Sequence, residues 1–344
     1  MIDTFSDDEL AYLLDRRPSA NHVDNANLKG KVVVVTGAGG TVGSELCIQL
    51  LTANVSTLVL VEHSEFALYE IYETLINLQK VLKAPATEVV PRLVSVLDEA
   101  EMFNILSIYR PNIIYHAAAY KHVHMVEMNS RVGIKNNVLG TYITSKLAKH
   151  FGVDQYILVS SDKAINPINV MGYSKLMSEK IILSVADNTH TKFYIARFGN
   201  ILGSSGSVLP KFIKQLKAGL PMSISSPESS RFFMLKSEAI NLLLEIVNLS
   251  GVSGTTYCFD MGEAIKILNL AERLHVLLNR QSTPPQIEYR QSESYEKVQE
   301  ESLLTPDAKK TSHSKIFEIH LNLKTKPDLQ TILAVVEKLN EFKH

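Results

Sequence analysis

The sequence predicts an α/β protein: a Rossmann-like, doubly wound parallel sheet followed by a smaller, partly helical C-terminal lobe. Between residues 31 and 199, short apolar runs rich in Val and Ile alternate with segments long enough for a helix. A glycine-rich turn follows the first run, and the alternation ends after about residue 199, where Gly, Ser and Pro become frequent. Such alternation is typical of βαβ units in a parallel sheet that helices cover on both faces.

Each apolar run predicts a strand, and each intervening segment a helix. The strands are expected at 31–37, 56–62, 91–97, 112–118, 155–161 and 192–199. The helices between and after them are expected at 43–53, 65–82, 99–108, 130–151 and 171–187. In the lobe, helices are expected within 203–219, at 237–249 and at 266–279, with an amphipathic one at 329–342. We therefore expect an N-terminal arm (1–28), a first domain (29–200) and a lobe (201–344), some of whose strands can return to the first domain.

Composition excludes several classes of protein. The chain is 45% apolar and 21% charged with a net charge of −1, so a nucleic-acid surface is not expected. No apolar run reaches the roughly 18 residues that span a bilayer, and the acidic N-terminus does not have the order of residues of a secretory signal. Cys47 and Cys258 lie far apart without CxxC spacing, which argues against a disulfide or zinc. We expect a reduced, cytoplasmic protein.

A dinucleotide site is predicted at the first strand–helix turn. Gly37, Gly40 and Gly43 stand there, and Thr41 and Val42 open the helix. Such a turn needs glycine where the backbone meets a pyrophosphate, and the helix N-terminus supplies N–H donors. The preceding strand and following helix make an unrelated glycine turn the weaker interpretation.

The next strands predict the rest of the cofactor site. Glu62 ends the second strand, where a carboxylate binds both ribose hydroxyls and repels a 2′-phosphate, so NAD is favoured over NADP. A surface glutamate is the alternative. Ser95 and Val96 after the third strand are expected near adenine, and Ala117 and Ala118 after the fourth also near the cofactor.

These residues resemble the extended short-chain dehydrogenase/reductase superfamily, and within it the polysaccharide-biosynthesis nucleotide-sugar 4,6-dehydratases that act on UDP-N-acetylglucosamine. The similarity runs from about residue 28 to about 275 through TGAGGTVGSEL, HAAAYKHV, NNVLGT, SSDKAINPINVMGYSK, RFGNILGSSGSVLPKF and FDMGE. The resemblance implies oxidation of the sugar at carbon 4 by NAD, loss of water across carbons 5 and 6, and return of hydride to carbon 6. It assigns the elimination to Asp162 and Lys163.

The chemistry of the residues agrees with these roles. Lys163 can be a base only if its pKa is lowered, which Lys175 and the nicotinamide ring would do. Asp162 must be protonated to donate to the leaving hydroxyl. A structural Asp–Lys pair at a strand end is the alternative.

Met171 stands where a Tyr-x-x-x-Lys pair would have its tyrosine, four residues before Lys175. The family resemblance places methionine there in a configuration-retaining subgroup. Tyr173 does not share a helix face with Lys175 and is a poor substitute. We therefore expect Ser161 to orient the 4-hydroxyl, Lys175 to hold the nicotinamide ribose, and the proton to leave through water or the Asp162–Lys163 pair.

Five further positions are expected at or beside the substrate site. Lys121 and His122 are expected at the edge of the sugar pocket. By the family resemblance, Asn200 and Arg231 lie near the substrate pyrophosphate, and Asn137 supports the active-site lysine. His122 and His124 have no third ligand in view, so no metal site is predicted. Where relatives have an arginine that holds the nucleotide, the simplest register places Glu293, and Arg290 or Lys297 would have to replace it. The sugar and the nucleobase therefore stay open.

Two other functions stay open as well. An epimerase would share the oxidation at carbon 4 but lose no water, and an inactive NAD-binding scaffold would bind the cofactor without turnover. Family members commonly pair or form larger assemblies, so a homo-oligomer is expected. The segment LLDRRP resembles the region after the membrane segment of longer relatives, so this chain is expected to be a version or piece without that segment.

Overall fold

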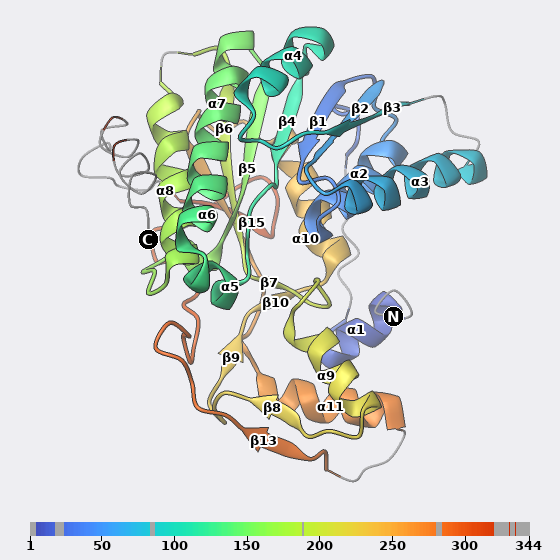
Figure 1. Cartoon of the computed structure of the whole chain (residues 1–344), viewed down its shortest axis with the longest axis vertical. Helices are drawn as coiled ribbons and strands as arrows, with labels where there is room; N and C mark the ends of the chain where they lie inside the picture. Colours follow the sequence, from blue (N-terminus) through green and yellow to red (C-terminus); the bar gives the residue numbers. More distant parts are fainter. Residues whose placement is uncertain are drawn as a thin grey trace.

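The fold is built on one nine-stranded sheet (Figure 1). The computed structural model describes residues 5–17, 24–82, 87–187, 189–279 and 284–319, together with 330 and 334. The strand order is β14-β15-β11-β6-β5-β4-β1-β2-β3. The strands from β11 to β3 are parallel, whereas β15 and β14 pair antiparallel at the edge. The predicted doubly wound α/β class is confirmed.

The sheet and its covering helices have these bounds. The strands are β1 Val32–Thr36, β2 Thr57–Glu62, β3 Glu88–Leu93, β4 Ile113–His116, β5 Gln155–Ser161, β6 Lys192–Phe198, β11 Thr255–Phe259, β14 Lys309–Lys310 and β15 Ile316–Ile319. The helices are α2 Thr41–Thr52, α3 Glu65–Leu82, α4 Glu99–Tyr109, α7 Gly140–Phe151, α8 Val170–Val185 and α10 Lys236–Glu245. Short turns of helix add α5 Val123–Met128, α6 Ser130–Ile134, the π-turn η1 Lys135–Leu139, and the 3₁₀ turns η2 Asp162–Ala164 and η3 Ile246–Asn248.

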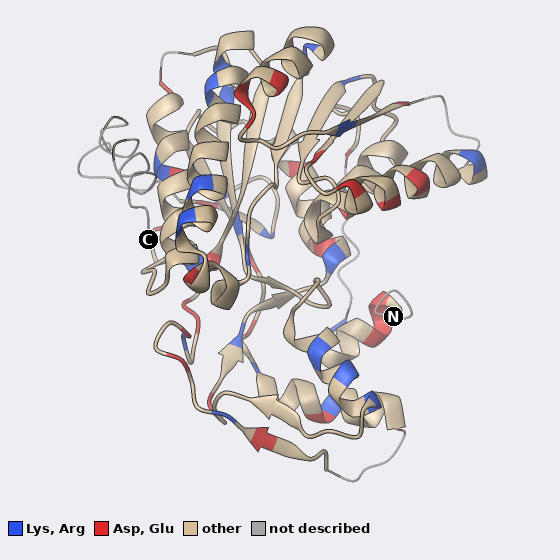
Figure 2. Ribbon diagram, in the orientation of Figure 1, with Lys and Arg blue, Asp and Glu red and all other residues tan. Residues whose placement is uncertain are grey.

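Two apolar cores cover the two faces of the sheet. Because successive side chains of a strand alternate, Val33 and Val35 enter the core shared with α2, α3 and α10, while Val34 enters the core shared with α4, α7 and α8. Figure 2 shows the central strands almost without charged residues, which lie on helices and loops instead. The nearly continuous apolar runs of the sequence reflect this burial on both faces.

A third core lies in a separate lobe below the carboxyl ends of the strands (Figure 1). It is formed by α1 Asp7–Leu13, α9 Val208–Lys217 and α11 Ile267–Asn279 with short strands between them. These pairs are β8 Met222–Ile224 with β13 Ile287–Tyr289, β9 Ser230–Arg231 with β12 Ile265–Lys266, and β7 Asn200–Ile201 with β10 Phe233–Met234. By contrast, some elements after residue 201 join the first domain. The large sheet includes β11, β14 and β15, and α10 packs on it.

Some elements differ from their predicted bounds. β3 begins and ends earlier than the predicted 91–97. It ends early because the chain turns at Ser95, where Leu97 N–H donates to Ser95 Oγ (3.2 Å) and Asp98 N–H donates to the Ser95 carbonyl (2.9 Å). The helix predicted at 130–151 is divided by the π-turn η1. The helix predicted at 329–342 lies almost wholly outside the described residues. In the described part of the chain, no helix is both long and apolar enough to cross a membrane.

Candidate active site

The glycine turn after β1 packs so closely against neighbouring backbone that it has no room for side chains. Gly37 has φ +68°, and a Cβ there would lie 2.8 Å from the backbone of Ala118. A Cβ on Gly43 would lie 2.0 Å from the carbonyl oxygen of Gly37. Gly40 is the N-cap of α2 and offers no side-chain cap, so the first-turn N–H groups can serve an anion. These features fit the diphosphate of a dinucleotide.

Glu62 is held beside this turn by backbone donors. Its Oε2 accepts from Gly39 N–H at 3.1 Å, and its Oε1 accepts from His63 N–H at 2.9 Å and Ser64 N–H at 3.1 Å. The carboxylate is buried at the carboxyl end of β2. Its position agrees with the predicted ribose contact, although the same bonds also order the turn.

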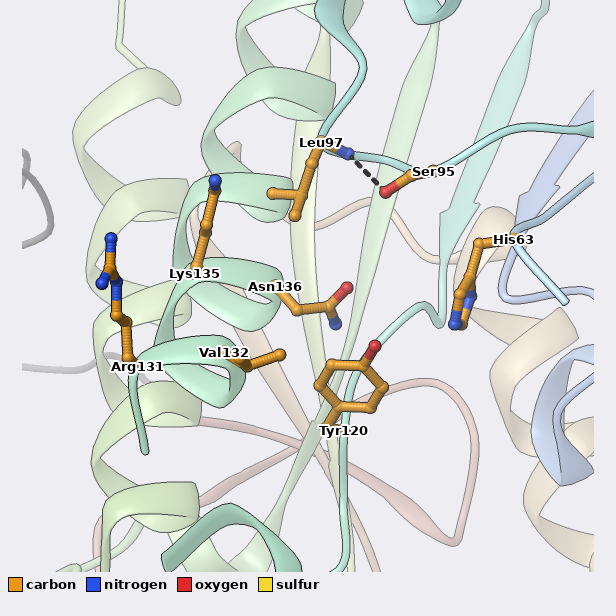
Figure 3. Close-up of a pocket in the computed structure, with 8 residues that line it drawn as sticks. All are labelled: His63, Ser95, Leu97, Tyr120, Arg131, Val132, Lys135 and Asn136. Atoms are coloured by element: carbon orange, nitrogen blue, oxygen red, sulfur yellow. Dashed lines mark hydrogen bonds between the residues drawn. The ribbon is translucent and has the colours of Figure 1, made fainter. Parts of the chain in front are cut away.

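A cavity of about 220 Å³ runs along this edge of the sheet. Its lining includes the predicted Gly37, Gly40, Glu62, Ser95, Val96, Ala117 and Ala118. It also includes Gly39, His63, Tyr120 and Asn136, which the sequence analysis did not single out. A neighbouring cavity of about 330 Å³ shares Ser95, and Figure 3 shows Tyr120 and His63 beside it, with ring centroids 6.2 Å apart. The two cavities adjoin, since His63, Ser95, Tyr120 and Asn136 line both.

Two predicted helix residues lie beside the cavity rather than in its lining. The Thr41 hydroxyl donates to Ser205 Oγ (3.3 Å) and accepts from Ser205 N–H (3.2 Å), which ties the glycine turn to the lobe. Val42 packs against the core under α2. Only their backbone groups are thus placed to face a phosphate.

Asp162 and Lys163 form the centre of a polar cluster where β5 ends. Ser161 Oγ donates to Asp162 Oδ1 at 2.8 Å, and Lys163 Nζ donates to the same oxygen at 3.1 Å. Lys163 Nζ also donates to Asn200 Oδ1 at 3.1 Å. The structure therefore brings the predicted residues Ser161, Asp162 and Lys163 together, and adds a contact of Lys163 with Asn200 that the sequence analysis did not predict.

Glu300 completes the cluster, and the sequence analysis missed it. Its Oε1 lies 2.8 Å from Lys163 Nζ and 3.3 Å from Arg231 Nε, while its Oε2 accepts from Asn200 Nδ2 at 2.7 Å. This contact is how Arg231 joins the site. No sequence signal marked Glu300, because it stands in a polar stretch where acidic residues are expected on the surface.

The charges of the cluster differ from expectation. Burial alone lowers the pKa of Lys163, but the Asp162 and Glu300 carboxylates outweigh it, so the pKa lies above its ordinary value rather than below. Burial alone raises the pKa of Asp162, but Lys163 and hydrogen bonds bring it below its ordinary value. The pKa of Glu300 is raised by burial, against the opposing effect of Lys163. Lys163 is therefore an ammonium in this arrangement.

The first two turns of α8 carry Met171 and Lys175 into the interior. Asn169 caps the helix by accepting from Gly172 N–H at 2.8 Å, and a Cβ on Gly172 would lie 2.5 Å from the Lys163 carbonyl oxygen. Met171 is 2% exposed and Lys175 is 7% exposed, whereas Tyr173 is 54% exposed. Tyr173 points away from the interior, in agreement with the expectation that it cannot replace the missing tyrosine.

Lys175 lies in a polar network separate from Lys163. Its Nζ donates to the Val159 carbonyl at 2.8 Å, and burial lowers its pKa to about 8. Nearby, the ring of buried His116 contacts the hydroxyls of Thr36 (2.8 Å) and Thr141 (3.2 Å). Burial and Lys175 lower the pKa of His116 to about 3, so the ring is neutral.

Asn137 supports the site from behind instead of facing a substrate. Its side chain accepts from Tyr120 N–H (2.8 Å) and donates to the Tyr120 carbonyl (3.0 Å) and Ser174 Oγ (2.9 Å). In the π-turn its own carbonyl accepts from the hydroxyls of Thr141 (2.6 Å) and Ser178 (2.8 Å). It therefore joins the loop after β4 to α8.

Lys121 and His122 stand on the loop after β4. Burial lowers the pKa of Lys121, and the Lys163 ammonium lowers it further, which places the two cations near each other. His122 approaches the lobe so closely that a Cβ on Gly206 would lie 2.4 Å from its ring. Both residues are therefore placed between the Asp162–Lys163 cluster and the lobe.

A cavity of about 320 Å³ opens in the lobe next to the cluster. Its lining includes Asn200, Ser207, Lys211, Arg231 and Arg290. Arg290 is bonded to Glu296, with 2.6 Å between Nη2 and Oε1. Neither Glu293 nor Lys297 is among its described lining residues, and Lys297 bonds the Ile165 carbonyl and Glu301 instead. Of the two cations that could replace the missing arginine, Arg290 lines this cavity and Lys297 is not among its lining residues.

Fold and site together define an extended short-chain dehydrogenase/reductase. The family model "Polysaccharide biosynthesis protein" matches residues 33–321. The probable polysaccharide biosynthesis protein EpsC of Bacillus subtilis is 35% identical over 96% of this chain and 54% of its own length. The chain belongs to this polysaccharide biosynthesis family, and it spans about half the length of that curated relative.

Other known proteins are similar over shorter stretches or in fold. UDP-N-acetylglucosamine 4,6-dehydratase (inverting) of Campylobacter jejuni is 34% identical over 47% of this chain and 49% of its own length. The X-ray structure of Pen from Bacillus thuringiensis has a TM-score of 0.73 and 26% identity, covering 85% of this chain and 90% of that one. UDP-glucuronic acid 4-epimerase from Bacillus cereus, solved with UDP-glucuronic acid and NAD, shares the fold with a TM-score of 0.65 and 19% identity over 78% of this chain and 88% of that one.

Proposed function

We propose that this protein is an NAD-dependent nucleotide-sugar 4,6-dehydratase, a hydro-lyase that converts UDP-N-acetylglucosamine to the 4-keto-6-deoxy sugar for surface polysaccharide biosynthesis. The observation that carries the proposal is the Asp162–Lys163 pair, which forms a cluster with Asn200, a residue that also lines the lobe cavity. Family membership and the similarity to the Campylobacter dehydratase support it.

The cofactor part of the proposal depends on the glycine turn between β1 and α2. Gly37 and Gly43 let the backbone of this turn pack tightly, Gly40 leaves the first N–H groups of α2 without a side-chain cap, and Glu62 is held at the end of β2 by the Gly39 N–H. When bound, NAD supplies a hydride acceptor at carbon 4 and a donor at carbon 6. The residues proposed to hold it are Gly37, Glu62 and Lys175.

The elimination is assigned to the residues of the cluster. Ser161 is placed next to Asp162 Oδ1, so it can orient the 4-hydroxyl toward that carboxyl. Asp162 would take that proton and give it to the departing 6-hydroxyl. Lys163, once neutral, would remove the proton from carbon 5 and return it. Because Met171 is buried and cannot accept a proton, none of these steps is assigned to it.

The nucleotide is proposed to occupy the lobe cavity. Arg231 and Arg290 line it, and guanidinium groups suit a diphosphate. Cys47 and Cys258 are free and buried, which fits a reducing cytoplasm. A homo-oligomer is proposed through α5, α6 and the start of α8, where Met125, Met128, Val132 and Tyr173 are exposed.

The experiment that tests the function is incubation with NAD and UDP-N-acetylglucosamine in deuterated water, followed by mass and NMR analysis. Loss of one water with deuterium at carbon 5 is expected. A product of unchanged mass and inverted carbon 4 would instead identify an epimerase. An unchanged sugar beside tight NAD binding would identify an inactive scaffold, and turnover of another nucleotide sugar would correct the substrate only.

A further inference from the structure

Glu300 is the one strongly buried acid at the cluster to which the proposed mechanism gives no role. It lies on the segment between β13 and β14, and its side chain is 5% exposed. Its carboxyl group faces Lys163, Asn200 and Arg231 at contact distances between 2.7 and 3.3 Å. Burying a carboxyl is costly unless it is paired, so this placement needs a reason.

The mechanism contains a step that Lys163 cannot make alone. A base must be a neutral amine, yet Lys163 Nζ lies between two carboxyl groups that favour its ammonium form. A proton must therefore leave Nζ before carbon 5 is attacked. The candidates within hydrogen-bonding distance are Asp162 Oδ1 at 3.1 Å and Glu300 Oε1 at 2.8 Å, whereas the Asn200 amide is no base.

Of the two carboxyls, Glu300 is the better acceptor. Asp162 already accepts from Ser161, and its Oδ2 is buried without a partner other than the Glu300 carboxyl. Two carboxyls this close do not both stay ionised easily, so one of them readily holds a proton that leaves Lys163. Burial shifts the pKa of Glu300 upward, while the pKa of Asp162 is lowered, so a proton that leaves Lys163 goes to Glu300, whose carboxylate pairs with Lys163 and Arg231 beforehand.

We infer that Glu300 is a third acid–base residue of this site, which takes a proton from the Lys163 ammonium so that the amine can act as the base. This inference rests on the proposed function. The N–H bond of Lys163 breaks as an O–H bond forms on Glu300, and Asp162 stays available for the 4-hydroxyl proton. After hydride and proton have returned to carbons 6 and 5, Glu300 gives its proton back to Lys163. No electrons are exchanged, and the cluster ends as it began.

The test is Glu300→Gln, which keeps size and hydrogen bonding but cannot take the proton. We expect kcat at pH 7 to fall on the order of 100-fold, the usual size for an acid–base group, with KM changed less than about threefold. Because Lys163 must then lose its proton to solvent, the kcat of the variant should rise about tenfold per pH unit into the alkaline range, while that of the wild type stays nearly flat. The charges that face Glu300, on Asp162, Lys163 and Arg231, with Lys121 beyond, are unchanged in both proteins.

The matched control is Glu301→Gln. Glu301 is the next residue and half exposed, and it bonds Lys297 and Asn166 outside the cluster, so its kcat and pH profile should stay within about twofold of wild type. NAD binding and the melting temperature check folding. Should Glu300→Gln not fold, Glu300→Asp replaces it, with intermediate kcat expected because a carboxyl remains.

Active wild type together with a Glu300→Gln variant of unchanged rate and pH profile would overturn this inference and leave the proposed function intact. A faster variant at pH 7 would also overturn it, since Glu300 would then hold Lys163 back. Wild type that dehydrates no nucleotide sugar overturns the proposed function and the inference with it.

Discussion

At the scale of single residues, burial of Lys175 links chemistry to stability. Its pKa of about 8 lies below the ordinary 10.5. Below pH 8 Lys175 is charged in both the folded and the unfolded chain. Burying this charge then lowers the free energy of unfolding by roughly 3 kcal/mol. Between about pH 8 and 10.5 the unfolded chain binds more protons than the folded one, so stability rises with pH.

Lys175→Met should remove this pH dependence. We compare the free energy of unfolding of the variant minus that of wild type at the two pH values. This difference should be larger at pH 7 than at pH 10 by roughly 3 kcal/mol. Urea unfolding at both pH values measures it, with Lys29→Met on an exposed loop as the control. An equal difference at the two pH values would show that Lys175 is not the buried cation described.

A second residue-scale prediction concerns Arg290. It lines the lobe cavity, while Glu293 does not, so Arg290→Gln should weaken UDP binding about tenfold by removing a charged hydrogen bond. Glu293→Gln, three residues away, should leave it within about twofold. Calorimetric titration with UDP measures both. Equal effects of the two substitutions would place the nucleotide elsewhere.

At the scale of elements, what could be predicted depended on local pattern. The six strands could be predicted because each is a continuous run of apolar residues. The glycine turn could be predicted because its glycines stand close together in the sequence. The role of Asn137, which lies in the π-turn η1, depends instead on contacts with residues far away in the sequence. Its side chain bonds the Tyr120 carbonyl after β4 and the Ser174 hydroxyl on α8. Glu300 escaped prediction for the same reason, since only the folded chain brings residues 163 and 300 together.

Asn137→Ala should therefore act on stability through two elements at once. It would leave the N–H and carbonyl of Tyr120 and the Ser174 hydroxyl without their buried partner, at a cost of about 2–3 kcal/mol. Asn77→Ala, on the exposed side of α3, should cost less than about 1 kcal/mol. Urea unfolding compares them. A similar small loss in both would mean that the loop after β4 is not held by Asn137.

At the scale of the whole molecule, α1 joins the lobe to the sheet. Leu10, Leu13 and Leu14 enter the lobe core. Arg16 pairs with Glu238 of α10 and donates to the Met261 carbonyl at 3.2 Å, next to the large sheet. The predicted arm at 1–28 therefore contains an element that packs on the residues after 201, which its acidic and polar composition did not indicate.

Leu13→Ala should separate the two binding functions. Leu13 is fully buried, so its truncation should lower the free energy of unfolding by about 2–5 kcal/mol, whereas Tyr12→Ala on the exposed side of α1 should change it by less than about 1 kcal/mol. The lobe cavity, proposed to hold the nucleotide, is lined by residues of α9, β8 and α11 that pack with Leu13, so UDP should bind at least about threefold more weakly to Leu13→Ala. Among the described residues, those that line the cavity proposed for the cofactor all lie between 37 and 136, so NAD binding should stay within about twofold. Calorimetric titrations with each ligand decide, and an equal loss of NAD binding would show that the lobe core and the cofactor turn respond as one unit.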